Sequence, residues 1–156
     1  MAYQITVSKV LEKAIQKEIE SQQLYRHLSE KMTDEAAQDA FRELARQEQG
    51  HQQLLERYLH GELKGGMLNE GQVVDYKIAE HLEQPQLYLE MKLKDVFLLA
   101  ANREKASHDF YLSLAQIHPD GEVKRLIEEL ATQELDHKQK VEFLYTEVAF
   151  PQTNGG

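Results

Sequence analysis

Apolar residues recur at alternating spacings of three and four along four long stretches of the chain, as they do in helices that bury one face. The stretches predict helices over about 8–32, 34–60, 93–117 and 121–148. Residues at the helix ends agree with this division, since Thr33 and Asp34 are typical caps and Gly61 is a typical stop. The pattern therefore predicts an all-α chain.

The four predicted helices form two copies of one unit. The segment Glu-Leu-Ala-x-Gln-Glu-x-x-His-x-Gln occurs at 43–53 and again at 129–139, an offset of 86 residues. The same offset relates the first predicted helix to the third and the second to the fourth. Two copies are too few for a solenoid, so two helical hairpins should pack as a closed antiparallel four-helix bundle.

Residues 61–92 form the connection between the two hairpins, with a short helical piece expected at about 74–82. The connection is long enough to cross from one end of the bundle to the other. A chain of 156 residues suits a single domain, which we expect over 1–150, followed by a flexible tail at 151–156.

The inward face of each helix is apolar except near its middle, where ionisable residues interrupt it. These residues are Glu18, Glu48, His51, Glu104, Glu134 and His137. Each of the four Glu lies 15 residues from a turn, at Thr33 in one hairpin and Pro119 in the other. Residues equidistant from the turn of an antiparallel hairpin face one another, so we expect all four at one level.

Buried carboxylates and imidazoles need a counter-charge, and the inward faces contain neither Lys nor Arg. Divalent cations supply that charge. Glu and His are suitable ligands for iron, manganese or zinc, and six side chains suffice for two ions when some carboxylates bridge. The pattern thus predicts a dinuclear metal site.

Together with Tyr25 and Tyr111, this arrangement resembles the ferritin-like di-iron carboxylate superfamily, and most of all its rubrerythrin-like branch. The resemblance implies two iron ions per chain. It also implies one role for each ligand: Glu18 and Glu104 terminal, Glu48 and Glu134 bridging, and His51 and His137 one nitrogen per metal.

The resemblance implies that Tyr25 and Tyr111 donate hydrogen bonds to carboxylates of the opposite hairpin, a tentative catalytic role. Ordinary core packing is the alternative. Gln47 and Gln133 precede the bridging Glu residues and are either hydrogen-bonded at helix interfaces or surface residues. Gly50, inside the second predicted helix, permits a close helix approach or a local bulge.

Three departures from related proteins narrow the expected function and cofactors. Rubrerythrin peroxidases have an extra carboxylate three residues before the third-helix ligand, where this chain has Ala101. Bacterioferritins have a haem-ligating Met directly after the second-helix Glu, where this chain has Gln49, so no haem is expected. The chain contains no cysteine and therefore no rubredoxin-type iron site to deliver electrons.

The composition limits the partners and the location. A net charge of −9 repels phosphate backbones, so no nucleic-acid partner is expected. The chain has neither a signal peptide pattern nor an apolar run that suggests a membrane span, and the default location is cytoplasmic.

The leading hypothesis is a di-iron oxidoreductase that reacts with dioxygen or hydrogen peroxide, as a ferroxidase or a peroxidase. It would use an external electron donor protein and form a homodimer. Non-catalytic iron binding or storage is one alternative, and an interaction module stabilised by zinc or manganese is another. The sequence leaves the native metal and the donor open.

Overall fold

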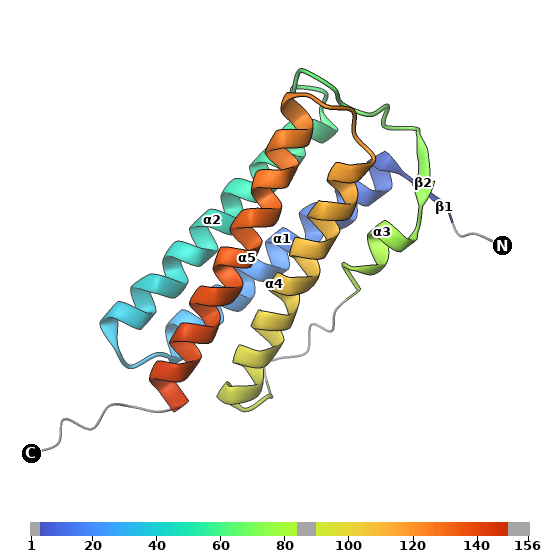
Figure 1. Ribbon diagram of the computed structural model, residues 1–156. Helices are drawn as coiled ribbons and strands as arrows, with labels where there is room; N and C mark the ends of the chain where they lie inside the picture. The colour runs from blue at the N-terminus through green and yellow to red at the C-terminus, as the bar shows by residue number, and fades with distance from the viewer. Residues whose placement is uncertain (1–3, 84–89, 150–156) are drawn as a thin grey trace, which may run out of the picture.

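In the computed structural model, which describes residues 4–83 and 90–149, four long helices form an antiparallel bundle (Figure 1). They are α1 (Val7–Lys31), α2 (Glu35–Leu59), α4 (Leu93–Gln116) and α5 (Glu122–Ala149). Each end lies within one residue of the boundary expected from the sequence. The predicted tail at 151–156 lies outside the described residues.

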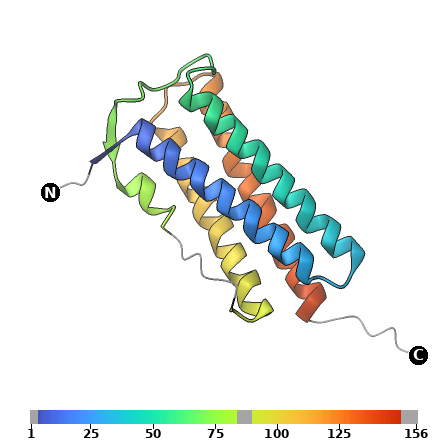
Figure 2. The same ribbon diagram turned by 180° about the vertical axis from the view of Figure 1, so that it is seen from behind.

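The two hairpins turn at opposite ends of the bundle. The α1–α2 turn lies at the end where α4 begins, whereas α2 ends at the opposite end, so the chain crosses the length of the bundle between α2 and α4 (Figures 1 and 2). The fold is therefore the predicted ferritin-like bundle with a crossover between its second and third long helices.

A small sheet was not expected from the sequence. Strand β1 (Gln4–Thr6) pairs antiparallel with β2 (Val73–Asp75) in the connection. The helical piece expected at about 74–82 is shorter, because β2 occupies its start and α3 comprises only Lys77–Glu80. The Asp75 side chain accepts a hydrogen bond from the backbone N–H of Lys77 at 2.9 Å, a local turn that ends the strand.

Local interactions set the beginning and the end of α2. Asp34 accepts a hydrogen bond from the backbone N–H of Ala37 at 3.0 Å, which confirms the predicted cap. Gly61 has a φ of 72°, a left-handed conformation that glycine adopts without steric cost.

The core consists of two apolar clusters on either side of an ionisable layer. Cluster 1, near the α4–α5 turn, includes Val10, Leu55, Phe110, Leu114 and Ile127. Cluster 2, near the α1–α2 turn, includes Leu28, Phe41, Phe97, Val141 and Leu144. The six predicted ionisable residues lie between these clusters, and each long helix contributes one or two of them.

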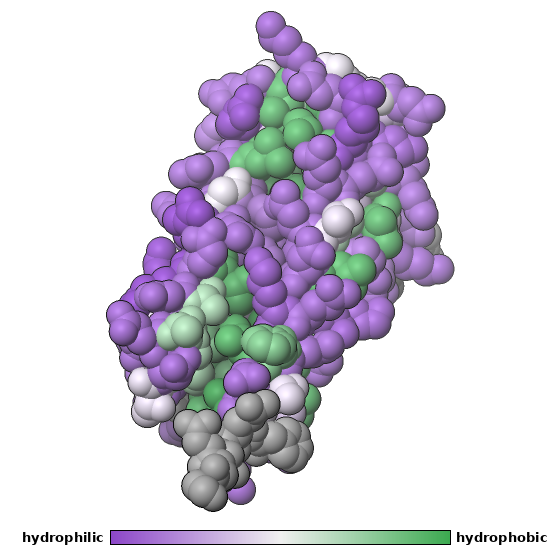
Figure 3. All heavy atoms as spheres, turned by 60° about the vertical axis from the view of Figure 1, so that its left-hand side comes forward, coloured by the Kyte–Doolittle hydropathy of each residue, from purple (hydrophilic) through white to green (hydrophobic). Residues whose placement is uncertain are grey.

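The outer surface also varies along the bundle. Seen from the side of α2 and α5, a hydrophilic band separates two apolar areas (Figure 3).

Within the described ranges, no helix is both long and apolar enough to span a membrane.

Candidate metal centre

All six ionisable residues expected at one level come together in the middle of the bundle. They form two groups in which one possible ligand atom from each residue lies within 4.8 Å of the others. The groups are Glu18, Glu48, His51 and Glu134, and Glu48, Glu104, Glu134 and His137. Glu48 and Glu134 belong to both groups, which is the arrangement that two neighbouring cations with shared carboxylates require.

Both imidazole rings direct Nδ1 at the carboxylates. Nδ1 of His51 lies 2.8 Å from a Glu134 oxygen, and Nδ1 of His137 lies 2.7 Å from a Glu48 oxygen. Each ring thus approaches a carboxylate of the other hairpin. The rings are nearly parallel, at an angle of 10°, with centroids 5.6 Å apart.

The donor set fits metal ions because several buried atoms of the layer lack a hydrogen bond. One carboxylate oxygen of each of the four Glu and Nδ1 of His51 are in this state. The Glu48 side chain is 0% exposed. A buried polar atom without a hydrogen bond is costly unless another partner satisfies it, and oxygen and imidazole nitrogen are suited to a divalent cation.

Two tyrosines close the layer by hydrogen bonds between the hairpins. The Tyr111 hydroxyl donates to Glu18 at 2.5 Å, and the Tyr25 hydroxyl donates to Glu104. Burial and the adjacent carboxylate charge raise the pKa of each tyrosine well above its usual value, so both hydroxyls keep their protons. Each tyrosine can therefore only donate to its carboxylate.

The carboxylates fall into two electrostatic pairs. Burial raises the pKa of Glu18, but hydrogen bonding and the charge of His51 more than compensate and lower it to about 2. Burial likewise opposes ionisation of Glu104, yet its interactions with His137 and its hydrogen bonds hold its pKa below the usual value. Glu18 and Glu104 are therefore ionised at neutral pH.

The shared carboxylates behave oppositely. Burial, followed by the charges of neighbouring carboxylates, raises the pKa values of Glu48 and Glu134 well above the usual range. Burial disfavours a charged imidazole, but the surrounding carboxylates outweigh it and raise the pKa values of His51 and His137. Without metal, two carboxylates and two imidazolium rings balance, and the shared pair holds protons that cations can displace.

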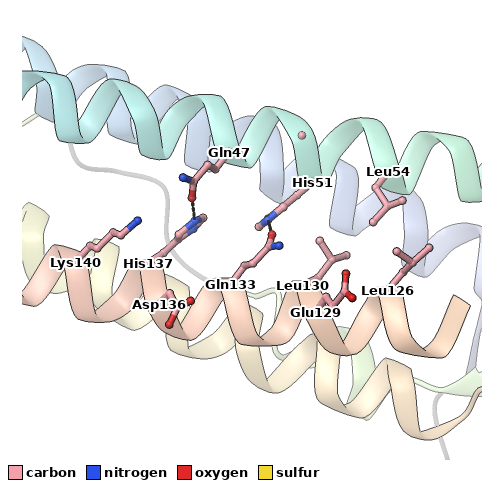
Figure 4. A pocket seen from close by; sticks show the side chains of 11 residues that line it. Gln47, His51, Leu54, Leu126, Glu129, Leu130, Gln133, Asp136, His137 and Lys140 are labelled. Carbon is pink, nitrogen blue, oxygen red and sulfur yellow. Dashed lines mark hydrogen bonds between the residues drawn. The ribbon is translucent and has the colours of Figure 1, made fainter. Parts of the chain in front are cut away.

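Two glutamines, whose role the sequence left open, orient the imidazole rings. Nε2 of His51 lies 2.6 Å from the Gln133 side-chain oxygen, and Nε2 of His137 lies 2.6 Å from that of Gln47 (Figure 4). An amide oxygen only accepts, so Nε2–H is the donor in each pair and Nδ1 faces the carboxylates. The 86-residue offset relates Gln47 to Gln133. It does not reveal that each glutamine bonds the histidine of the other hairpin.

A buried arginine beside the layer was missed by sequence reasoning. Arg103 is 6% exposed, and its guanidinium lies 3.3 Å from the Ser21 hydroxyl and 3.5 Å from a Glu20 oxygen. It precedes Glu104 directly, as Lys17 precedes Glu18 in the other repeat. The matched cation before each carboxylate was the signal available in the sequence.

Ala101 occupies the position where rubrerythrin peroxidases have an extra carboxylate. It is buried and belongs to apolar cluster 2. At this position the chain contributes packing and no further donor.

A four-helix bundle with two overlapping Glu and His groups in its core defines the ferritin-like di-iron carboxylate class. The model of the rubrerythrin family matches residues 9–145. The chain therefore belongs to the rubrerythrin family.

Comparison with solved structures supports the fold. The chain is similar to a protein described as a ferritin-like diiron-carboxylate protein from Thermotoga maritima, with 24% identity and a TM-score of 0.73. The match covers 95% of this chain and 99% of the other. The comparison with curated proteins gives no match.

Proposed function

We propose that the central layer binds two iron ions per chain and acts as an oxidoreductase site for dioxygen or hydrogen peroxide. One ion takes Glu18 and His51 as its own ligands, and the second takes Glu104 and His137. Glu48 and Glu134 bridge the two. The observation that carries this proposal is that the same two carboxylates belong to both groups of possible ligands.

Charge balance supports two divalent ions in the layer. Binding them requires four ionised carboxylates and two neutral imidazoles, whose summed charge cancels that of the ions. The metal-free layer reaches neutrality with protons on Glu48, Glu134 and the rings, as their raised pKa values indicate. Metal ions and protons therefore compete for the same buried positions.

Iron bound in this layer supplies electrons for the reduction of dioxygen or hydrogen peroxide. The protein's part is to hold its ligands in place. Tyr25 and Tyr111 donate to Glu104 and Glu18 and fix the orientation of these two carboxylates. Gln47 and Gln133 hold the rings with Nδ1 directed inward.

Electrons for repeated turnover come from outside the chain in this proposal. No cysteine is present to build a second iron site, so we propose an external donor protein and a homodimer as the working assembly.

The test is anaerobic loading with Fe(II), followed by rapid mixing with peroxide or with dioxygen. Two irons per chain should bind and oxidise together, with one of the two oxidants reacting faster. Glu48→Gln removes a bridge and should abolish this reaction, whereas Glu128→Gln, at an exposed position of α5, should leave it intact.

Other outcomes would replace the proposal. Binding of iron without rapid oxidation favours storage. A protein isolated with zinc or manganese, whose spectrum does not respond to reductant and peroxide, favours a metal-stabilised interaction module.

A further inference from the structure

The two sides of the ionisable layer differ in what covers them. On the side of α1 and α4, the Arg103 guanidinium fills the space between the helices and lies 3.4 Å from the backbone oxygen of Lys17. The Lys17 ammonium is also nearby and pairs with Glu20 at 3.2 Å. Burial and the Arg103 charge lower the pKa of Lys17, which reflects the crowding of cations there. A divalent cation meets buried positive charge on this side.

The side of α2 and α5 instead carries a pocket of about 470 Å³. Its floor is formed by the two amide–imidazole pairs, Gln47 with His137 and Gln133 with His51 (Figure 4). In each ring, Nε2 contacts a glutamine of the pocket and Nδ1 faces the carboxylates. A single imidazole ring therefore separates the pocket from the carboxylates. Of the pockets found among the described residues, this one contains both predicted histidine ligands in its lining.

Apart from the two imidazole rings of its floor, the pocket lining carries more negative than positive charge. Glu129 and Asp136 contribute carboxylates, and Lys140 is the only Lys or Arg in the lining. Apolar side chains complete one end of the pocket, namely Leu54, Leu126 and Leu130. The carboxylates of the pocket lining therefore offer oxygen atoms that can replace water around an entering ion.

Gly50 keeps the pocket open. A Cβ at this position would meet no heavy atom within 4 Å, so the space in front of it is empty. Glycine inside a helix is less favourable than alanine, and no turn or positive φ requires it here. In the second repeat the matching residue is Asp136, which lines the same pocket from α5. The missing side chain at residue 50 leaves room in front of His51.

We propose that this pocket is the route by which divalent metal ions enter and leave the central layer. The inference rests on the proposed function only in requiring that the layer binds metal. Asp136 and Glu129, at separate points of the pocket lining, first attract the ion. The hydrogen bond between a glutamine and its imidazole then breaks, the ring swings, and the ion passes to the carboxylates. The ring returns, and its Nδ1 then faces the ion while Nε2–H donates to the glutamine again.

The experiment measures cobalt(II) uptake by the full chain from its visible absorption, and then release of cobalt to an excess of chelator. Gly50→Phe places a ring in the pocket, because a helical side chain leans toward the preceding turn, here toward Gln47. Uptake and release should both slow by about tenfold, with the final two ions per chain and the affinity unchanged.

Two control variants separate a blocked route from other effects. Gly50→Ala restores helix propensity but adds only a methyl group, and should exchange metal as the wild type does. Gln49→Phe adds the same ring at a neighbouring exposed position outside the pocket lining, and should also leave the rates unchanged.

A charge-changing pair of variants tests the direction of the electrostatic effect. Asp136→Asn should slow uptake and Lys140→Gln should accelerate it, each by about two- to fivefold at low salt, with smaller effects at high salt. Identical rates for Gly50→Phe and wild type would overturn the route, as would equal slowing in Gln49→Phe. A wild-type chain that binds no cobalt would instead overturn the proposed function as well.

Discussion

The apolar clusters and the ionisable layer between them occupy the same bundle but have opposite energetic roles. The clusters bury mainly apolar side chains, so they stabilise the folded chain whether or not metal is present. The layer buries six ionisable side chains whose charges balance only when protons or cations are present. The difference indicates that the ends of the bundle hold the fold, while the middle is the proposed binding site.

Truncating a cluster side chain should have the largest effect on stability. Phe41 is 0% exposed and packs edge-on against Phe97, with ring centroids 5.5 Å apart. Phe41→Ala should lower the free energy of unfolding by about 3–5 kcal/mol, as measured by denaturant titration. The metal stoichiometry should remain that of the wild type.

The control for this prediction is an exposed phenylalanine. Phe143 is 63% exposed, and Phe143→Ala should change the free energy of unfolding by less than about 0.5 kcal/mol. Equal losses from the two substitutions would contradict the assignment of stability to the clusters.

Removing a shared carboxylate should act on the layer without weakening the clusters. In wild type, free metal at about 100 times its Kd stabilises the folded chain by about 2.7 kcal/mol for each bound ion. Glu48→Gln should lose most of that gain and keep the metal-free stability, because the amide replaces a carboxyl group that is protonated without metal. Thermal denaturation with and without cobalt(II) measures both quantities.

Glu128→Gln, on the exposed face of α5, is the matched control for this loss. It should keep the full response to metal. A wild-type response in Glu48→Gln would remove Glu48 from the proposed bridge.

Stability should depend on pH in opposite directions with and without metal. Glu48 and Glu134 have raised pKa values when folded, as do His51 and His137, so the folded chain holds protons that the unfolded chain loses. Each such group lowers the free energy of unfolding by about 1.4 kcal/mol per pH unit while it keeps its proton.

Between pH 6.5 and 8 the metal-free chain should therefore become less stable by at least about 2 kcal/mol, which is the contribution of a single such group over this range. The metal-loaded chain should gain from metal binding over the same range, because fewer protons compete. Thermal denaturation of both forms across this range checks the prediction. Parallel curves for the two forms would count against proton–metal competition in the layer.

The smallest predicted effect concerns the tyrosine hydroxyls that join the layer to the clusters. Tyr25→Phe and Tyr111→Phe each remove one hydrogen bond to an ionised carboxylate and should lower the free energy of unfolding by about 1.5 kcal/mol. The effects should match, since the two positions are equivalent in the repeats. Tyr145→Phe, at a partly exposed ring near Phe97, is the control and should have almost no effect. Unequal losses would argue against equivalent roles.

Much of the fold followed from the sequence because its determinants are local and repeated. The spacing of apolar residues gives the helices, and the 86-residue offset gives the pairing of the hairpins. Equal distances from Thr33 and Pro119 placed the four carboxylates at one level, where the structure brings them together.

The parts that sequence reasoning missed depend on contacts between distant segments. Strands β1 and β2 are only three residues each, and their pairing joins the start of the chain to the connection. Gln47 and Gln133 contact the histidine of the other hairpin, which spacing within one helix does not reveal. Arg103 is buried because Ser21 leaves room on a different helix, and its burial depends on that packing.

In the proposed site, two metal ions share Glu48 and Glu134 in the middle of the bundle. Anomalous diffraction at the iron absorption edge, from crystals loaded anaerobically with Fe(II), tests this site most directly. We expect two peaks per chain about 3.5–4 Å apart, between the two shared carboxylates. A single peak, or peaks confined to the surface of the protein, would contradict it.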